Sequence, residues 1–245
     1  MTDLRVGHLY PEHLNIYADR GNIAVLRARC GWRGLGFEHA ASSLGESLDP
    51  DAHDLFYMGG GQDRDQVAIA GDLVAKAGDL RSAVDGGAAV LAVCGGYQLL
   101  GHGYRGHSGD DMPGTGLVDL VTDAGPTRMI GNIAIRCELG PGGPRTVVGF
   151  ENHAGRTHLG PGVEPLGRVL HGHGNNGEDG GEGVRAGRVI GTYIHGPLLP
   201  KNPWLADWLV RQALERRHGT VELDPLDDAL ELEAHRVAER IAAGG

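Results

Sequence analysis

Cys94 stands where a nucleophile could be held. The stretch LAVCGGYQLLG (91–101) places this cysteine after an apolar run and before two glycines. A turn from a strand into a helix lifts a side chain out of the sheet, and the positive end of the helix dipole favours a thiolate there. The small residues Ala92, Gly95 and Gly96 would let such a turn close. A free cysteine is more commonly a small buried hydrophobe, so both interpretations stay open at this point.

A thiol that attacks a carbonyl carbon needs a base and hydrogen-bond donors for the developing oxyanion. His195 ends the apolar run VIGTYIHG ahead of a proline, and this position at a strand end makes it the candidate base. The run YMGGGQD (57–63) offers the backbone N–H groups of Gly60 and Gly61 at the end of an earlier strand. An ordinary glycine-rich turn is the alternative interpretation of that run.

The elements that would position these residues alternate over the first hundred positions. Apolar runs predict strands within 4–10, 35–43, 53–66 and 88–93, and helical spacing predicts helices within 14–34 and 67–87. This alternation predicts an α/β fold in which a central, mostly parallel sheet is flanked by helices.

After Gly101 the sequence becomes richer in strands. The short β-like runs GLVDLVTDA, RMIGNIAIRCEL, RTVVGFEN and RVIGTYIHG are separated by Gly and Pro turns. HGHGNNGEDGGEG (171–183) predicts a mobile loop without strand or helix. A helix is expected from Asn202 on, and a C-terminal helix at Asp224-Pro225, a good N-cap and first-turn pair. We therefore expect a main domain over residues 1–218 and a helical tail over 219–245.

Composition argues against several classes of protein. The 22 basic and 32 acidic residues give a net charge of −10, which argues against nucleic acid as the main partner. Three cysteines without a CxxC pair argue against a disulfide framework or a zinc site and fit a reducing compartment. The chain shows no signal peptide and no apolar stretch near the ~18 residues of a membrane span. We expect a soluble, cytoplasmic protein without a bound metal.

Two strings together resemble a known family. AVCGGYQLLG, around Cys94, and GTYIHGP, around His195, are similar to the class I (triad-type) glutamine amidotransferases, and CGGYQ is similar to their cobyric acid and cobyrinate branch. YPEHLNIYADRGNIAVLRARCGWRG, GFENHAGRTHLG and HGNNGEDGGEGV are similar to the glutaminase subunits of lipid II isoglutaminyl synthases. The resemblance spans residues 4 to 215 and implies a flavodoxin-like sheet.

The resemblance implies roles for individual residues. Cys94 would attack the side-chain amide of glutamine, and a glutamyl thioester would form. His195 would activate the thiol and later protonate the departing ammonia. Backbone N–H groups at Gly60 and Gly61 and after Cys94, at Gly95, would form the oxyanion hole.

Two side chains would bind the substrate, and one expected side chain is missing. Arg128, in GPTRMIGN, would grip the substrate carboxylate with two parallel hydrogen bonds; a solvated turn residue is the alternative. Gln98 would support the pocket. Most triad-type enzymes carry a glutamate two residues after the histidine, where this chain has Pro197. We hypothesise that a partner subunit supplies that carboxylate or orders the site.

The resemblance also implies a reaction shared between two subunits. This chain would hydrolyse L-glutamine and pass ammonia to a Mur-ligase-like partner in a heterodimer, for amidation of the D-glutamate α-carboxyl of lipid II in peptidoglycan synthesis. It has no GxxxxGK[ST] string, so ATP and Mg²⁺ are expected on the partner and no cofactor here. The alternatives are the glutaminase component of another amidating system, such as corrinoid amidation, and a cysteine hydrolase or binding module on the same fold.

Overall fold

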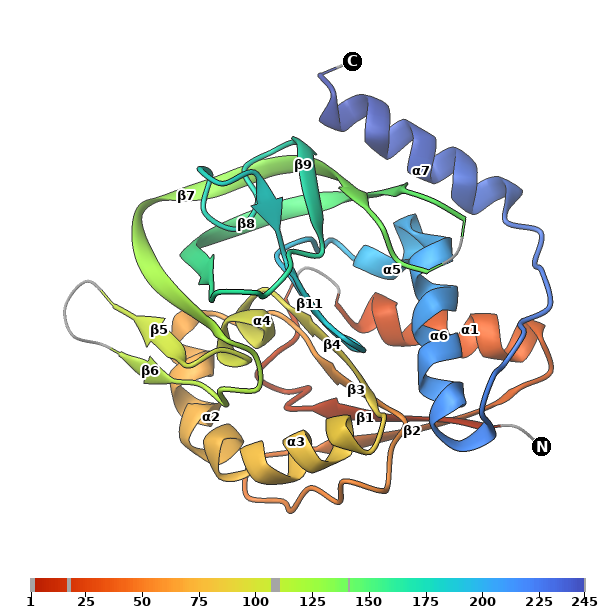
Figure 1. Ribbon diagram of the computed structural model, residues 1–245, viewed down its shortest axis with the longest axis horizontal. Coiled ribbons are helices and arrows are strands. Elements are labelled where there is room, and N and C mark those ends of the chain that lie inside the picture. Colours follow the sequence, from red (N-terminus) through yellow and green to blue (C-terminus); the bar gives the residue numbers. More distant parts are fainter. Residues whose placement is uncertain (1–2, 17–18, 107–110, 141, 245) are drawn as a thin grey trace.

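The first sheet contains the apolar strands predicted for the first hundred residues. The computed structural model describes residues 3–16, 19–106, 111–140 and 142–244. The six strands are β1 (Asp3–Leu9), β2 (Gly36–Ser42), β3 (Leu55–Met58), β4 (Ala89–Val93), β11 (Val184–Ala186) and β12 (Val189–Thr192). Their order is β11-β12-β4-β3-β1-β2, and all neighbours are parallel except β11 and β12 (Figure 1). β3, β4 and β12 are buried along their whole length, as central strands of a parallel sheet are.

Helices cover both faces of this sheet, as predicted (Figure 1). They are α1 (Arg20–Trp32) and α6 (Pro203–His218) on one face, α2 (Asp63–Ala75) and α3 (Ala77–Asp85) on the other, and the short α4 (Gly95–Leu99) and α5 (Leu198–Lys201) after two strand ends. The helix predicted within 14–34 begins only at Arg20, and its buried face carries Ile23, Leu26 and Cys30. No helix in the described ranges is long and apolar enough to cross a membrane.

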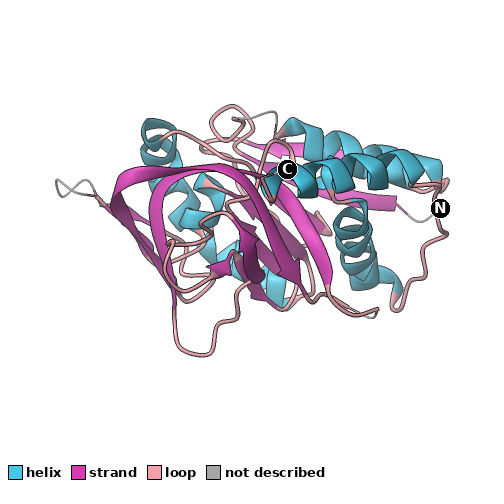
Figure 2. Cartoon of the chain, turned by 90° about the horizontal axis from the view of Figure 1, so that it is seen from above, coloured by secondary structure: helices cyan, strands magenta, loops and turns pink. Residues whose placement is uncertain are grey.

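The second sheet is built on two long antiparallel strands. Its members are β5 (Gly103–Arg105), β6 (Met112–Pro113), β7 (Leu120–Cys137), β8 (Arg145–Leu159), β9 (Gly167–His171) and β10 (Gly181–Glu182). Figure 2 shows the longest strands arching over one end of the molecule, while most helices gather toward the other end.

One expectation for this half was wrong: the runs around 120 and 130 are not separate strands. They join in β7, because the Gly125-Pro126 pair forms a bulge rather than a turn, with the register shifting between Ala124 and Met129. A Cβ on Gly125 would lie 2.6 Å from the Ala154 carbonyl oxygen, so the bulge requires glycine.

The glycine-rich segment 171–183 also differs from expectation, because it contains β10. Asn175 and Asn176 are buried in it. The Asn175 side chain donates to the Gly183 carbonyl at 2.9 Å and accepts from the Gly183 N–H at 2.8 Å. Hydrogen bonds from the Asn175 side chain to the backbone therefore hold the part of this segment that lies outside a regular strand ladder.

The C-terminal helix α7 (Ala229–Ala242) begins later than Asp224-Pro225. The Arg33 Nε donates to the Asp224 carbonyl at 2.7 Å, and Arg29 pairs with Asp228 at 2.7 Å, so this segment is held as a strap along α1. Helix α7 then packs on β7, β8 and α5. The division into a domain ending at 218 and a tail stays a prediction.

Candidate active site

Cys94 lies on a sharp turn between β4 and α4. Its backbone has φ 51° and ψ −108°, a left-handed conformation that costs energy in a residue other than glycine. A Cβ on Gly96 would lie 2.7 Å from that of Met58, so this glycine lets α4 pack against the end of β3. The strand–turn–helix predicted around Cys94 is confirmed, and its geometry is that of a nucleophile elbow.

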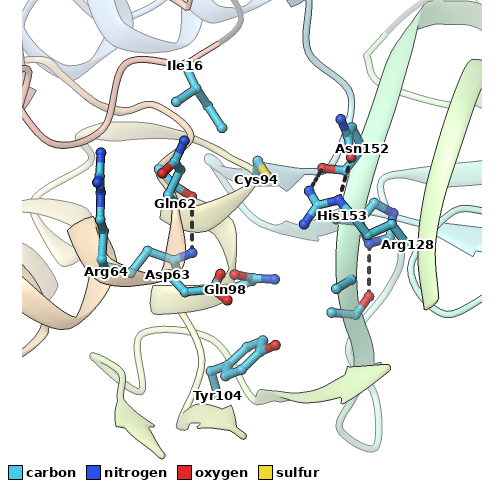
Figure 3. Close-up of a pocket in the computed structure, with 14 residues that line it drawn as sticks. Ile16, Gln62, Asp63, Arg64, Cys94, Gln98, Tyr104, Arg128, Asn152 and His153 are labelled. Carbon is cyan, nitrogen blue, oxygen red and sulfur yellow. Dashed lines mark hydrogen bonds between the residues drawn. The ribbon is translucent and has the colours of Figure 1, made fainter. Parts of the chain in front are cut away.

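The Cys94 side chain lines a cavity of about 690 Å³ (Figure 3). This volume suits a small ligand. Gly61, Gln98 and Arg128 line the same cavity, so the structure brings four of the predicted site residues together. The other lining residues are Ile16, Gln62, Asp63, Arg64, Gln66, Tyr104, Asn152, His153, Ala154 and Gly155.

His195 follows β12, the strand beside β4. In this pair Val93 lies opposite Thr192, so the segments that carry Cys94 and His195 leave the sheet at the same edge. The His195 backbone pairs with Phe150 of β8 through N–H···O bonds of 2.9 and 3.1 Å. This pairing fixes the His195 backbone, and with it the starting point of the imidazole side chain, where the two sheets meet.

The His195 imidazole is fully buried and does not belong to the described lining of the cavity. Burial lowers its pKa to about 4, and the charges of His153, Arg128 and Lys201 act in the same direction. His153 and Arg128 both line the cavity, so His195 lies within electrostatic range of that wall. A neutral imidazole at neutral pH is the state that accepts a proton.

The Cys94 thiol is protonated at rest. Burial raises its pKa to about 12, and the Asp19 carboxylate raises it further. The Gly95 N–H and the Arg128 guanidinium act in the opposite direction, but more weakly. A neutral thiol beside a neutral imidazole is a resting pair in which a thiolate forms only by transfer of the thiol proton to a base.

Asp19 is a residue of this site that the sequence patterns did not reveal. It is fully buried, and its Oδ2 accepts the Gly60 N–H at 2.7 Å. A Cβ on Gly60 would lie 3.2 Å both from this Oδ2 and from the Cys94 Cβ. One of the N–H groups expected to stabilise an oxyanion is therefore engaged by a carboxylate beside the thiol. Burial raises the pKa of Asp19 to about 6, although the Gly60 hydrogen bond opposes the shift.

Arg128 projects from the bulged part of β7 toward the cavity (Figure 3). Its Nε donates to the Asn152 Oδ1 at 2.8 Å, and its Nη2 donates to the Asn152 carbonyl at 2.9 Å. These two bonds fix the plane of the guanidinium and leave its other donors for a ligand. The sequence patterns did not predict a role for Asn152, although it lies in GFENHAGRTHLG, one of the strings similar to the glutaminase subunits.

Gln98 is held by a buried hydrogen-bond network. Its Nε2 donates to the Tyr193 hydroxyl at 3.1 Å, and that hydroxyl lies 2.7 Å from the Thr157 Oγ1. The Tyr193 ring stacks on His153 with the centroids 3.6 Å apart. Since His153 and Gln98 both line the cavity, this network sets the shape of its wall.

The glycine-rich segment has a structural anchor close to this wall. Glu151 is fully buried and accepts hydrogen bonds from the His173 and Gly174 N–H groups and lies 2.8 Å from the His173 Nδ1. Burial raises the pKa of the Glu151 carboxyl, but hydrogen bonding to the His153 side chain, followed by the bonds from His173 and Gly174, holds it below its usual value. The described residues contain no group of three or more His, Cys, Asp or Glu placed to hold a metal ion.

Comparisons with known proteins agree with this geometry. Residues 5–203 match the family model of the CobB/CobQ-like glutamine amidotransferase domain. The chain is 37% identical over 237 residues to "Lipid II isoglutaminyl synthase (glutamine-hydrolyzing) subunit GatD" of Staphylococcus aureus (strain N315), covering 97% of this chain and 95% of that protein. It is 40% identical over 232 residues to the protein of the same name from Streptococcus pneumoniae (strain ATCC BAA-255 / R6), covering 94% and 88%.

A solved structure shares the fold. The structure of PurLQS from Thermotoga maritima superimposes with a TM-score of 0.58 over 86% of this chain and 95% of that chain, at 18% identity. The expectation of an α/β, amidotransferase-like fold with a strand-rich second half and a C-terminal helix is confirmed.

Proposed function

The chain belongs to the CobB/CobQ-like glutamine amidotransferase family, and from this premise we propose that it is the glutaminase subunit of a lipid II isoglutaminyl synthase. It hydrolyses L-glutamine and supplies ammonia to a Mur-ligase-like subunit, MurT, which amidates the D-glutamate α-carboxyl of lipid II. The observation that carries the proposal is the cavity shared by the Cys94 thiol on its strained turn and the Arg128 guanidinium.

The proposed reaction uses the two neutral groups of the resting site. As the Cys94 sulfur bonds to the side-chain amide carbon, the His195 imidazole accepts the thiol proton. The carbonyl oxygen becomes an oxyanion, and collapse of this intermediate breaks the C–N bond while the imidazolium gives its proton to the departing ammonia. Water, deprotonated by the same imidazole, then attacks the glutamyl thioester, so that glutamate leaves and the thiol is restored.

The proposed oxyanion hole needs one adjustment. The Gly95 N–H already acts on the Cys94 sulfur, but the Gly60 N–H is held by Asp19. The Asp19 carboxylate must turn away before the Gly60 N–H can serve a developing negative charge. Gly61 lines the cavity and is the neighbouring donor.

The partner completes the proposal. Glutamine hydrolysis through a thiol requires no cofactor in this chain, whereas activation of a carboxylate by ATP and Mg²⁺ belongs to the ligase. Pro197 stands where a glutamate would orient the histidine, so we propose that the partner supplies a carboxylate or orders the site. We place this heterodimer in the cytoplasm.

The test measures glutamate and ammonia formed from L-glutamine by the chain alone and with its Mur-ligase-like partner, together with amidation of lipid II in the presence of ATP. We expect hydrolysis that rises when the partner is added and amidation that depends on glutamine. The Cys94→Ala variant should lose both activities, yet keep amidation driven by added ammonium. Unchanged ammonia release by Cys94→Ala would overturn the proposal, and equal hydrolysis with and without the partner would remove the reason for a partner-supplied carboxylate.

A further inference from the structure

Two opposite charges face each other across the cavity. Figure 3 shows Arg128 on the wall formed by the second sheet and Asp63 on the opposite wall, with Cys94 between them at the head of the cavity. Asp63 is the first residue of α2, directly after the glycine-rich turn that ends β3. The two charges therefore come from a helix that follows a strand of the first sheet and from a strand of the second sheet.

The position of the Asp63 carboxylate favours binding of a ligand over pairing with a neighbouring side chain. Among the described residues that line the cavity it provides the one carboxylate, and within the described ranges that carboxylate makes no ion pair. Two residues on, Asp65 does not line the cavity and instead lies 3.7 Å from the Arg64 Nε. The Arg64 side chain points away from Cys94 in Figure 3, so Arg128 is the guanidinium that faces the thiol.

Both charges act on the same groups of the cavity. The Asp63 carboxylate raises, and the Arg128 guanidinium lowers, the pKa of the Cys94 thiol, although burial and Asp19 have the larger effects. Burial has the largest effect on the pKa of the Tyr104 phenol and raises it. Asp63 raises this pKa further, and Arg128 lowers it. Asp63 and Arg128 thus lie within electrostatic range of one small volume that also contains the reactive sulfur.

A free α-amino acid carries an ammonium and a carboxylate on one carbon atom, and a carboxylate and a guanidinium on opposite walls match that pair of charges. We propose that Asp63 binds the α-ammonium group of glutamine while Arg128 binds its α-carboxylate, so that the cavity selects free glutamine over glutamine analogues without a charged amine and over glutamine within a peptide. The inference rests on the proposed glutaminase function and names the substrate recognition of that same site. The side-chain amide, at the far end of the molecule, is then the group left to reach Cys94.

The test compares L-glutamine with two analogues in the complex of the chain and its partner. Glutaramate is glutamine without the α-amino group, and Nα-acetyl-L-glutamine has that nitrogen uncharged. The wild-type protein should prefer glutamine, and Asp63→Asn should lower kcat/KM for glutamine by roughly 10- to 100-fold, mainly through KM, since a hydrogen bond to a charged group is lost. The same substitution should leave kcat/KM for glutaramate nearly unchanged, so the preference collapses.

Asp65→Asn is the matched control, because it removes a carboxylate from the same helical turn outside the cavity. It should keep the wild-type preference. Asp63→Glu keeps the negative charge and should recover part of the preference for glutamine. Asp63→Ser replaces Asp63→Asn if Asp63→Asn does not fold. Equal loss for glutamine and glutaramate in Asp63→Asn, or a wild-type protein that uses glutaramate as well as glutamine, would overturn the assignment. A wild-type complex with no activity on glutamine would instead overturn the proposed function.

Discussion

The Cys94 N–H donates a hydrogen bond of 2.8 Å to the Thr192 carbonyl oxygen. This bond extends the pairing of β4 and β12 by one residue, to the point where the strained turn begins. His195 lies three residues after Thr192, so the candidate nucleophile and the candidate base leave neighbouring strands at one edge. A thiol late in one strand and an imidazole late in another reach the same region without any long loop.

The first prediction concerns the pH dependence set by His195. Because its pKa is lowered to about 4, the imidazole is uncharged at pH values around 7. It becomes protonated, and can no longer accept a proton, only in acid. In Asp19→Asn, which removes the other group that titrates in this range, we expect kcat/KM for glutamine to stay flat through pH 6.5, where an ordinary histidine titrates. His195→Ala should lower kcat by roughly 10²- to 10⁴-fold.

This profile is measured in the complex, and again in Asp19→Asn, because Asp19 titrates near 6. An acid limb centred near 6.5 that persists in Asp19→Asn would show that His195 is not the buried neutral base described here.

The second prediction concerns Asp19 and the thiol. The Asp19 carboxylate is the largest influence on the Cys94 pKa after burial, and it disfavours the thiolate. Asp19→Asn removes the negative charge and keeps an oxygen that can accept the Gly60 N–H, so it should lower the thiol pKa. We expect alkylation of Cys94 by iodoacetamide at a fixed pH to be faster by up to about tenfold, the effect of roughly one pKa unit.

Asp65→Asn serves as the comparison, because Asp65 is not among the groups that act on the Cys94 pKa. Equal alkylation rates in the wild-type protein and Asp19→Asn would mean that the carboxylate does not control the thiol.

The third prediction concerns Asn152, which orients Arg128 through bonds to its Nε and Nη2. Asn152→Ala removes the bond to the side-chain oxygen and keeps the one to the backbone carbonyl. We expect KM for glutamine to rise by about 5- to 10-fold with little change in kcat, the effect of about 1 kcal/mol, because the guanidinium loses one of its two anchors and keeps the other. Arg128→Gln should raise KM further, and Asn152→Asp, which restores an acceptor, should recover most of the loss. A fall in kcat at constant KM would contradict a positioning role for Asn152.

The fourth prediction concerns stability and Glu182. This carboxyl is fully buried against β12, where it accepts the Tyr193 N–H at 2.7 Å, and burial raises its pKa to about 8. The folded protein therefore holds the proton more tightly than the unfolded chain, where the group has its ordinary pKa near 4.5. Its contribution to stability is fully present below pH 4.5 and is lost as the pH rises through 8, by up to ~1.4 kcal/mol per pH unit.

Glu182→Gln imitates the protonated form and should remove this slope. Urea unfolding between pH 5 and 9 should show a difference in the free energy of unfolding between wild type and Glu182→Gln that moves in favour of the variant as the pH rises. A difference that is constant with pH would contradict the raised pKa.

The sequence predicted the parts of the site that depend on local chemistry. An apolar run, a cysteine and two glycines define the turn at Cys94, because a central strand must be apolar and only a glycine fits where Gly96 meets Met58. The end of β12 before His195 follows from the same kind of pattern. Both features could be predicted because they depend on residues that lie within a few positions of one another in the sequence.

Other features depend on contacts between distant segments, which single-sequence patterns do not contain. The Asp19 carboxylate accepts a hydrogen bond from Gly60, which lies 41 positions later, and the residues around Asp19 do not indicate that partner. Gly125-Pro126 has the composition of a turn, but the long pairing of β7 with β8 makes it a bulge. The start of α7 is set by the ion pair of Asp228 with Arg29, which lies 199 positions earlier.

In the proposed reaction the Cys94 sulfur forms a covalent bond with the side chain of glutamine. A diazoketone analogue of glutamine, which keeps the α-ammonium and α-carboxylate and alkylates an attacking thiol, tests it most directly by mass spectrometry of the labelled protein. We expect a single label on Cys94, loss of ammonia release in proportion to labelling, protection by excess L-glutamine and no label in Cys94→Ala. Loss of ammonia release without a label on Cys94, or a label on Cys30 or Cys137 instead, would contradict it.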